Sequence, residues 1–174
     1  GPDVSLMCDA SRGFSADHAI RLGRRLEDFD LTWFEEPVAP YDYQGSARVA
    51  AALDTPIASG ETEATRYGFR SMLEAGAADI WMADLGRVGG VSEFVKVAHL
   101  AAAHDIAISN HLFTEQSLCL LGAFGNATWL EFMPWTARLY REGIAVEDGH
   151  IAVPDRPGLG FTFDLDAVDR HRIR

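Results

Sequence analysis

Ionisable side chains recur along the chain at intervals of 20 to 27 residues, about the length of one strand–helix unit. Each of them lies at or next to the end of a short apolar run. They are Asp9, Glu35, Glu61, Asp84, His111 and Glu131. In parallel α/β folds the carboxyl ends of the strands share one rim, where side chains leave the packed core and meet substrate. We therefore expect this set to converge at one rim.

The charge of this set limits the chemistry that it can perform. Carboxylates crowded into one site repel one another without a counter-charge, so their convergence predicts a divalent cation. Three carboxylates supply the hard oxygen ligands that Mg²⁺ prefers, and they leave positions for water and a substrate carboxylate. Successive side chains of the stretch "WFEEP" alternate in direction, so Glu35 is expected to face the metal and Glu36 the wall behind it.

Each of these residues also has a plainer explanation when it is taken alone, such as a turn, a helix cap, a loop hydrogen bond or a surface ion pair. Asp9 and Asp84 are typical turn formers. Glu61 suits the first turn of a helix, and Glu131 can pair with Arg138. Five of the six residues end consecutive strand candidates, and Glu131 lies one residue before the end of the sixth; this coincidence favours a shared site.

The elements that must position these residues are indicated by apolar patterning. Runs of five or six mostly apolar residues are typical of strands buried on both faces. They span residues 4–9, 31–35, 56–61, 79–84, 106–111 and 128–132. The intervening segments predict helices over 16–29, 63–76 and 91–105. Alternating strands and helices of this length predict right-handed βαβ units and a parallel sheet, which is the α/β class.

Some boundaries of these elements carry their own signals. Ser15 is expected to cap the first helix, whose apolar face is spaced by three or four residues and ends at Phe29. Gly76 suits the C-terminal cap of the second helix. Near the C-terminus, residues 144–153 predict a hairpin that turns at Asp148 and Gly149.

Composition narrows the class of protein. The chain has 174 residues, 48% of them hydrophobic, and no linker or low-complexity segment, so we expect one domain. A formal net charge of -11 opposes binding to nucleic acid or to anionic lipid. No run is long enough to span a membrane, and no signal peptide is recognisable. Cys8 and Cys119 make no disulfide framework, and the chain is expected to be cytoplasmic.

Several motifs, taken in order, resemble those of the mandelate racemase branch of the enolase superfamily, the mandelate racemase/muconate lactonizing enzyme family with its acid-sugar dehydratases. The motifs are "LMCDAS", "LTWFEEP", "IASGE", "WMADLGRVGG", "ISNHLFTE" and "TWLEFMPW". The resemblance covers nearly the whole chain. It implies a partial TIM-type (β/α)₇β barrel in which the six strands are strands three to eight. Residues 1–174 would then be the C-terminal part of the barrel domain, with a capping domain and the first two strands upstream.

The resemblance also implies roles for the individual residues. Asp9, Glu35 and Glu61 would be the ligands of Mg²⁺. His111 and Asp84 would form a catalytic dyad, and Glu131 would donate a hydrogen bond to the reacting substrate. Ser11 and Asn110 would contact the substrate. Relatives often have asparagine where this chain has Ser11, a change that affects substrate specificity more than metal binding.

The implied reaction is Mg²⁺-dependent removal of the proton α to a carboxylate, with stabilisation of the resulting enediolate. Dehydration of a sugar acid, an aldonate or an aldarate, is the first expectation. Racemisation or epimerisation of a 2-hydroxy acid is the alternative within the family. An alternative of another class is a metal-binding fragment without catalysis. The expected partner is a small carboxylate molecule, and assembly into a homo-oligomer is left open.

Overall fold

A parallel β-sheet forms the centre of the computed structural model, which describes residues 3–173. Its strands follow one another in space in the same order as in the sequence, β1 to β6. Their bounds are Met7–Asp9 (β1), Trp33–Glu35 (β2), Ile57–Ser59 (β3), Ile80–Asp84 (β4), Ala107–His111 (β5) and Ala127–Trp129 (β6). Every adjacent pair is parallel, which confirms the predicted βαβ arrangement.

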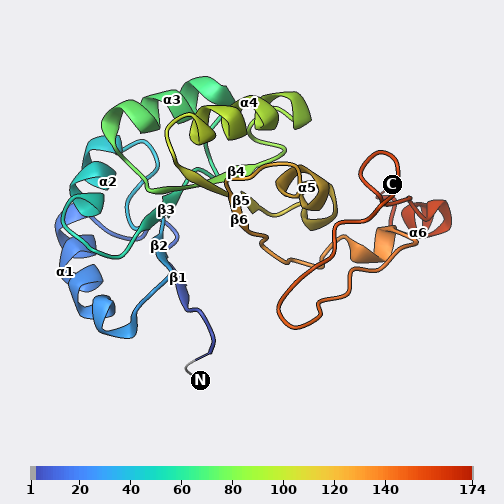
Figure 1. The fold of residues 1–174 in the computed structure, drawn as a ribbon, viewed down its shortest axis with the longest axis horizontal. Coiled ribbons are helices and arrows are strands. Elements are labelled where there is room, and N and C mark those ends of the chain that lie inside the picture. The colour runs from blue at the N-terminus through green and yellow to red at the C-terminus, as the bar shows by residue number, and fades with distance from the viewer. Residues whose placement is uncertain (1–2, 174) are drawn as a thin grey trace.

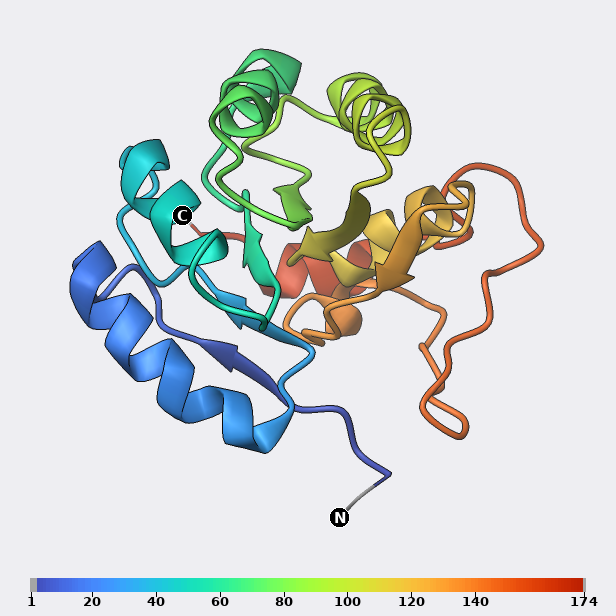
Figure 2. The same cartoon turned by 60° about the vertical axis from the view of Figure 1, so that its left-hand side comes forward.

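Helices connect the strands and lie along the outer side of the sheet (Figures 1 and 2). The α-helices are Ala16–Leu26 (α1), Tyr43–Ala50 (α2), Thr65–Ala75 (α3), Val91–Ala102 (α4), Thr114–Leu121 (α5) and Leu165–Arg170 (α6). Short 3₁₀ turns are Glu27–Phe29 (η1) and Ala137–Leu139 (η2). After β6 the chain is mostly irregular and ends in α6, to the right in Figure 1.

The sheet is curled into half of a barrel, as Figure 2 shows from the side. Trp33 of β2 and Trp129 of β6 make an edge-to-face contact with ring centroids 6.4 Å apart. These strands are four positions apart in the sheet, so only a curved sheet can bring their side chains together. Over the described residues the sheet ends at β1 and β6 and does not close. A partial barrel of the α/β class is therefore confirmed.

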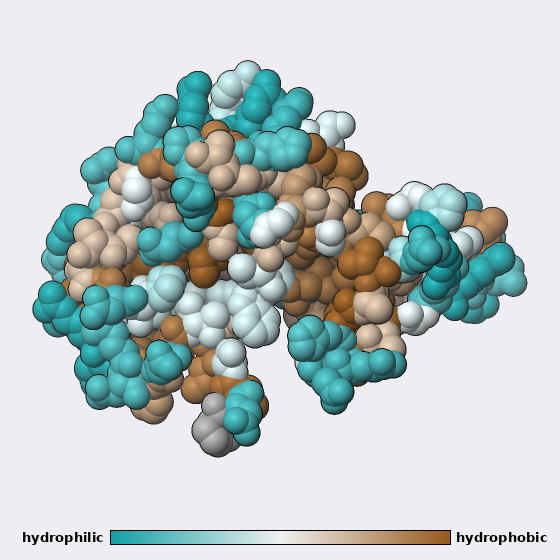
Figure 3. Space-filling model, in the orientation of Figure 1, coloured by the Kyte–Doolittle hydropathy of each residue, from teal (hydrophilic) through white to brown (hydrophobic). Residues whose placement is uncertain are grey.

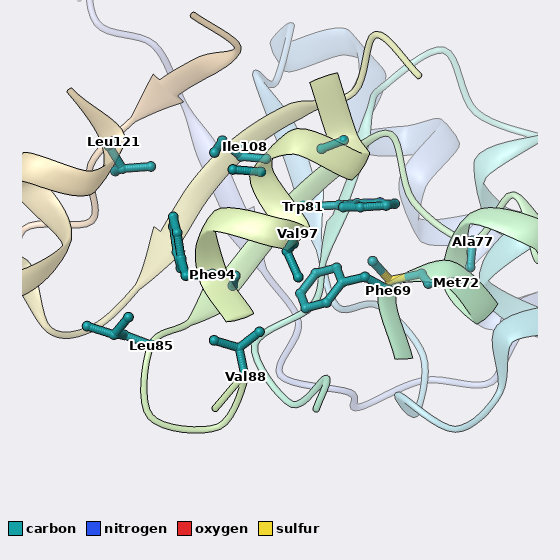
Figure 4. Packing of buried hydrophobic residues seen from close by; sticks show 13 residues of the cluster. Phe69, Met72, Ala77, Trp81, Leu85, Val88, Phe94, Val97, Ile108 and Leu121 are labelled. Atoms are coloured by element: carbon teal, nitrogen blue, oxygen red, sulfur yellow. The ribbon is translucent and has the colours of Figure 1, made fainter. Parts of the chain in front are cut away.

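The main core lies between β4, β5 and the helices α3 and α4 (Figure 4). Trp81 of β4 is fully buried and packs against Phe69 of α3 with ring centroids 5.1 Å apart. Phe94 of α4 and Ile108 of β5 are each 1% exposed. Burying a side chain of this size stabilises a fold by roughly 1.5–3 kcal/mol, so this cluster anchors the strands that carry the rim residues.

Helix boundaries differ in detail from those predicted. Ser15 is the N-cap residue of α1, but its side chain makes no capping hydrogen bond, so the predicted mechanism is wrong. Phe29 is 61% exposed because the α-helix ends at Leu26 and the 3₁₀ turn rotates this ring away from the core. Gly76 does adopt the left-handed C-cap conformation, with φ +67°, as its residue type predicted.

Residues 144–153 do not form a complete β-hairpin. Glu147 and His150 form an isolated antiparallel bridge around the expected turn, where Asp148 and Gly149 both have positive φ. The flanking residues do not continue as strands, so only the turn of the predicted hairpin is confirmed.

Hydrophilic and apolar residues occupy different parts of the molecular surface (Figure 3). Hydrophilic residues cover the outward side of the helices, and apolar residues appear toward the middle, between the sheet and the C-terminal segment. Exposed apolar side chains of the C-terminal part include Phe132, Trp135 and Phe163. Within residues 3–173, none of the helices has the length and apolar character needed to cross a bilayer.

Candidate active site

The carboxyl ends of the strands bring the expected residues to one rim of the half-barrel. Asp9, Glu35, Asp84 and His111 are the last residues of β1, β2, β4 and β5. The parallel register places Asp9 opposite Glu35, and Asp84 opposite His111. The other two rim residues, Glu61 and Glu131, each lie two positions beyond their strands and belong to the turns that follow.

His111 and Asp84 form a close side-chain pair. His111 Nδ1 lies 2.7 Å from Asp84 Oδ2, and the Asp84 residue is 3% exposed. The other oxygen, Asp84 Oδ1, accepts hydrogen bonds from the backbone N–H groups of Gly86 and Arg87, each 2.8 Å long. Asp84 is therefore both an Asx-turn residue and the partner of the histidine. The carboxylate fixes the orientation of the ring and leaves Nε2 as its second functional nitrogen.

Glu61 occupies the space next to this pair and is surrounded by positive groups. Its Oε2 lies 3.4 Å from His111 Nε2. Its Oε1 lies 3.0 Å from Arg87 Nη1 and 3.4 Å from Arg12 Nη1. The carboxylate of Glu61 thus links the histidine to two guanidinium groups.

A second group of rim residues lies over a cavity of about 230 Å³ on the inner side of the sheet. Asp9, Glu35 and Glu131 contribute its acidic part. Trp33, Trp129 and Met82 are among the side chains of its apolar part. An acidic edge above an apolar floor suits a small molecule that carries both a charged and an uncharged end.

The carboxyl group of Glu35 has the most strongly shifted pKa of the site. Burial, together with the smaller effects of the nearby carboxylates of Asp9, Glu131 and Glu61, raises its pKa to about 7. The indole N–H of Trp33 donates to Glu35 Oε2 over 3.1 Å, which partly opposes this rise. Ionisation of this carboxyl group is unfavourable without a counter-charge, so a bound cation would stabilise its charged form.

Glu36 lies away from this cavity, as its alternation with Glu35 predicted. The Glu36 residue is 3% exposed, and burial, followed by the charge of Glu61, raises the pKa of its carboxyl. Its nearest polar side chains are Ser59, whose hydroxyl donates over 3.4 Å, and Arg12, whose Nε lies 3.4 Å from Oε2.

Asp9 and Glu131 are held in place by neighbouring groups. Ser11 donates to Asp9 twice, from its backbone N–H over 2.6 Å and from its hydroxyl over 3.1 Å. Glu131 accepts from the backbone N–H of Leu112, a contact that takes the place of the considered ion pair with Arg138.

Asn110 lies behind the rim with no exposed surface. Its carbonyl accepts from the Glu131 N–H over 2.8 Å, and its amide donates to the Leu112 carbonyl over 2.7 Å. These bonds join the turns after β5 and β6, so Asn110 positions Glu131, and its assignment as a substrate contact stays a prediction.

The expected metal ligands are only partly brought together. Among residues 3–173, no three His, Cys, Asp or Glu side chains are close enough to share an ion, because Glu61 turns toward His111 and the arginines. The chemistry of the donors nevertheless fits Mg²⁺: they are hard carboxylate oxygens, and the pKa of one, Glu35, is raised by burial and then by its acidic neighbours. Their assignment as ligands stays a prediction.

Three residues of the site were not expected from the sequence in the roles that they take. Arg12 and Arg87 each lie three positions after a rim aspartate and pair with Glu61. Trp33 lies within an expected strand, and its indole N–H donates to Glu35. The available signal was positional: each lies within three residues of a rim carboxylate.

The fold and the rim together define a class of protein, a parallel α/β barrel portion with a histidine–aspartate pair among carboxylates at its C-terminal rim. Residues 1–167 match the family described as Enolase C-terminal domain-like. The chain belongs to this family, and the resemblance inferred from its motifs is confirmed.

Similar proteins include two curated dehydratases. L-talarate/galactarate dehydratase of Salmonella typhimurium is 40% identical over 167 residues, which are 96% of this chain and 42% of that protein. D-xylonate dehydratase of Haloferax volcanii is 37% identical over 180 residues, 98% of this chain and 43% of that protein. The chain thus spans less than half the length of either relative.

Solved structures agree with these similarities. The Salmonella enzyme, liganded with Mg and L-lyxarohydroxamate, matches with a TM-score of 0.92 at 39% identity and covers 97% of this chain and 43% of its own. An enolase from Bradyrhizobium, complexed with magnesium and mandelic acid, matches with a TM-score of 0.93 at 35% identity. That match covers 100% of this chain and 48% of the other.

Proposed function

We propose that this chain supplies the metal-binding and proton-transfer residues of a Mg²⁺-dependent enzyme that removes the proton α to a carboxylate and dehydrates a sugar acid. The observation that carries the proposal is the His111–Asp84 pair, 2.7 Å apart, at a rim crowded with carboxylates. The similarity to dehydratases of talarate, galactarate and xylonate supports an aldonate or aldarate as the substrate class.

The pair assigns the proton-transfer roles. Asp84 accepts from His111 Nδ1–H, so Nε2 is the nitrogen that takes the α proton. Dehydration then breaks the bond between the next carbon and its hydroxyl oxygen. The proton on Nε2 returns to the departing oxygen, water leaves, and the enol rearranges to a 2-oxo acid. One histidine can therefore serve both half-steps.

The acidic residues would hold the metal and bind the substrate. Asp9, Glu35 and Glu61 are the residues that would hold Mg²⁺. When bound, the ion supplies Lewis-acid stabilisation of the negative charge that develops on the substrate carboxylate. Glu131, which lines the cavity, would hydrogen-bond the substrate, and Ser11, which donates to Asp9, would orient that carboxylate.

Racemisation of a 2-hydroxy acid is the second candidate, because the similar Bradyrhizobium protein is complexed with magnesium and mandelic acid. It differs from dehydration in needing a second base on the face of the substrate opposite His111. Our proposal also includes a cytoplasmic location, supported by the two free thiols of Cys8 and Cys119, and assembly into a homo-oligomer.

Proton NMR in D₂O with Mg²⁺ and a panel of aldonic and aldaric acids tests the proposed function. We expect exchange at the α carbon or a dehydrated product with at least one acid, and loss of both signals in His111→Asn. A calorimetric titration with Mn²⁺ accompanies the assay. Metal binding without exchange would support the non-catalytic alternative, and the absence of both would overturn the proposal.

A further inference from the structure

Two turns of unusual backbone conformation lie side by side at the rim, one after β1 and one after β2. Ser11, Arg12 and Glu36 have φ angles of +43°, +65° and +35°, in the left-handed region that residues other than glycine rarely adopt. The Arg12 N–H donates to the Glu36 carbonyl over 2.7 Å, which ties the two turns together. The surrounding structure thus holds Arg12 in a defined place.

The side chain of Arg12 spans two carboxylates that follow successive strands. Its Nε lies 3.4 Å from Glu36 Oε2, and its Nη1 lies 3.4 Å from Glu61 Oε1. The Glu36 side chain is 2% exposed and the Glu61 side chain 12%, so water screens these contacts poorly. The planar guanidinium can contact both carboxylates at once, whereas the single ammonium group of lysine is less suited to this.

Arg87 approaches the same carboxylate from the turn after β4. Its Nη1 lies 3.0 Å from Glu61 Oε1 and donates to the Glu61 backbone carbonyl over 3.2 Å. Glu61 Oε1 therefore has two guanidinium neighbours. The arginines come from different turns, and each is fixed partly by backbone contacts of its own: the Arg87 N–H donates to Asp84 Oδ1.

We propose that Arg12 and Arg87 are positioning residues that act as fixed counter-charges for Glu61 and hold it in place against its acidic neighbours when no metal is bound. The inference rests on the proposed function in taking Glu61 as a metal ligand. Arginine and Mg²⁺ offset the same negative charge, so their contributions are antagonistic. A chain that lacks one of these arginines should gain more from the cation than the unmodified chain does.

Thermal unfolding of Arg12→Gln and Arg87→Gln, in EDTA and in MgCl₂ at matched ionic strength, tests this inference. The control is Arg48→Gln, which removes an arginine paired with Asp17 on the exposed surface. We expect both rim variants to melt below the control in EDTA and to show a larger upward shift with Mg²⁺ than the unmodified chain. Calorimetry should give roughly tenfold tighter Mn²⁺ binding, the effect of removing one nearby positive charge.

A double variant separates counter-charge from simple packing. Glu61→Gln removes the charge that Arg12 offsets, so Arg12→Gln should lower the metal-free melting temperature much less in the Glu61→Gln background. A purely structural arginine would cost the same in both backgrounds. If Arg12→Gln alone fails to fold, Arg87→Gln, whose side chain is 47% exposed, carries the comparison.

Opposite results would overturn the inference. They are metal-free melting equal to that of Arg48→Gln, a Mg²⁺ shift no larger than in the unmodified chain, or weaker Mn²⁺ binding by the rim variants. Failure of the proposed metal assignment has a different signature, because the unmodified chain would then bind no Mn²⁺, and failure of the proposed catalysis appears only in the D₂O exchange assay. In that case the metal-free double-variant comparison still decides whether the arginines offset the charge of Glu61.

Discussion

Two features of its surroundings disfavour the ionised form of Glu35. Its side chain faces a cavity with an apolar floor, and three further carboxylates lie near enough to raise its pKa. The hydrogen bond from Trp33 orients it without supplying a positive charge. In the absence of metal, the folded chain therefore favours the protonated form of Glu35, with a pKa of about 7 against an ordinary value of 4.5.

We predict that the metal-free chain loses stability as the pH rises toward neutrality. A raised pKa contributes stability that is complete below the unfolded value of 4.5 and is lost as the pH passes through about 7. Since Glu35 is only partly buried, we expect about 1 kcal/mol, less than the roughly 3 kcal/mol of the full shift. Urea unfolding in EDTA between about pH 5 and pH 8 measures this change.

Glu35→Gln should flatten that profile, because glutamine has no charged form. Glu74→Gln is the matched control, since Glu74 is an exposed acid paired with Arg70 on α3. An unchanged profile in Glu35→Gln would contradict the assignment of the pH dependence to this carboxyl.

The sequence could predict those rim residues that end a recognisable strand. His111 and Asp84 end strands with clear apolar patterns, so their proximity followed once the strands were recognised, although their catalytic role stays a prediction. The pairing of Arg12 with Glu36 and Glu61 could not be predicted. It depends on left-handed turns at residues whose types do not favour that conformation.

At the scale of elements, the connection from β3 to α3 shows how tightly the rim is built. Gly60 has φ +128° and lies directly before Glu61. A Cβ atom there would be 2.8 Å from Phe69 Cε1 and 3.3 Å from the backbone nitrogen of Met82. Glycine is therefore required both by the backbone angle and by the packing of the core against this turn.

We predict that Gly60→Ala destabilises the chain by about 2–4 kcal/mol, the sum of backbone strain and overpacking. Gly76→Ala is the control, because it also has positive φ but has open space where the Cβ would lie. It should cost only about 1–2 kcal/mol. Urea unfolding of both variants measures the difference, and equal costs would show that the contact with Phe69 does not matter.

The elements that the sequence predicted are those with the strongest periodicity. Strands buried on both faces leave continuous apolar runs, and α1, α3 and α4 have regular apolar faces. Helices α2 and α5 were not predicted. Each has only 8 residues, and α2 depends on Asp42, whose side chain accepts from the Gly45 N–H over 2.8 Å. Short helices of this kind are stabilised by caps and tertiary contacts more than by their own patterns.

For the molecule as a whole, the sheet order leaves β1 and β6 as edges within the described residues. Apolar side chains gather next to the first of these edges: Val4 is 64% exposed, Leu6 48% and Met7 38%. Exposed strand edges with apolar neighbours favour pairing with another chain. A partial barrel was implied by the family resemblance of the motifs, but the extent of these exposed surfaces needed the structure.

We predict that the chain self-associates through the β1 edge and that Leu6→Lys weakens this association, since a charged edge resists pairing. Sedimentation velocity over a range of concentrations measures the effect. Leu165→Lys, on α6 at the right of Figure 1, is the control because Leu165 is 66% exposed. Equal loss of association in both variants would argue against the β1 edge.

The contact between Trp33 and Trp129 gives the half-barrel a built-in optical reporter. Two indole rings with centroids 6.4 Å apart and planes inclined by 79° are close enough for their strong ultraviolet transitions to couple, and we expect a paired band in far-ultraviolet circular dichroism. The rings meet only while the sheet is curled, so flattening of the sheet would abolish the band even if every helix stayed intact. The curvature of the molecule can therefore be followed in solution without any added label.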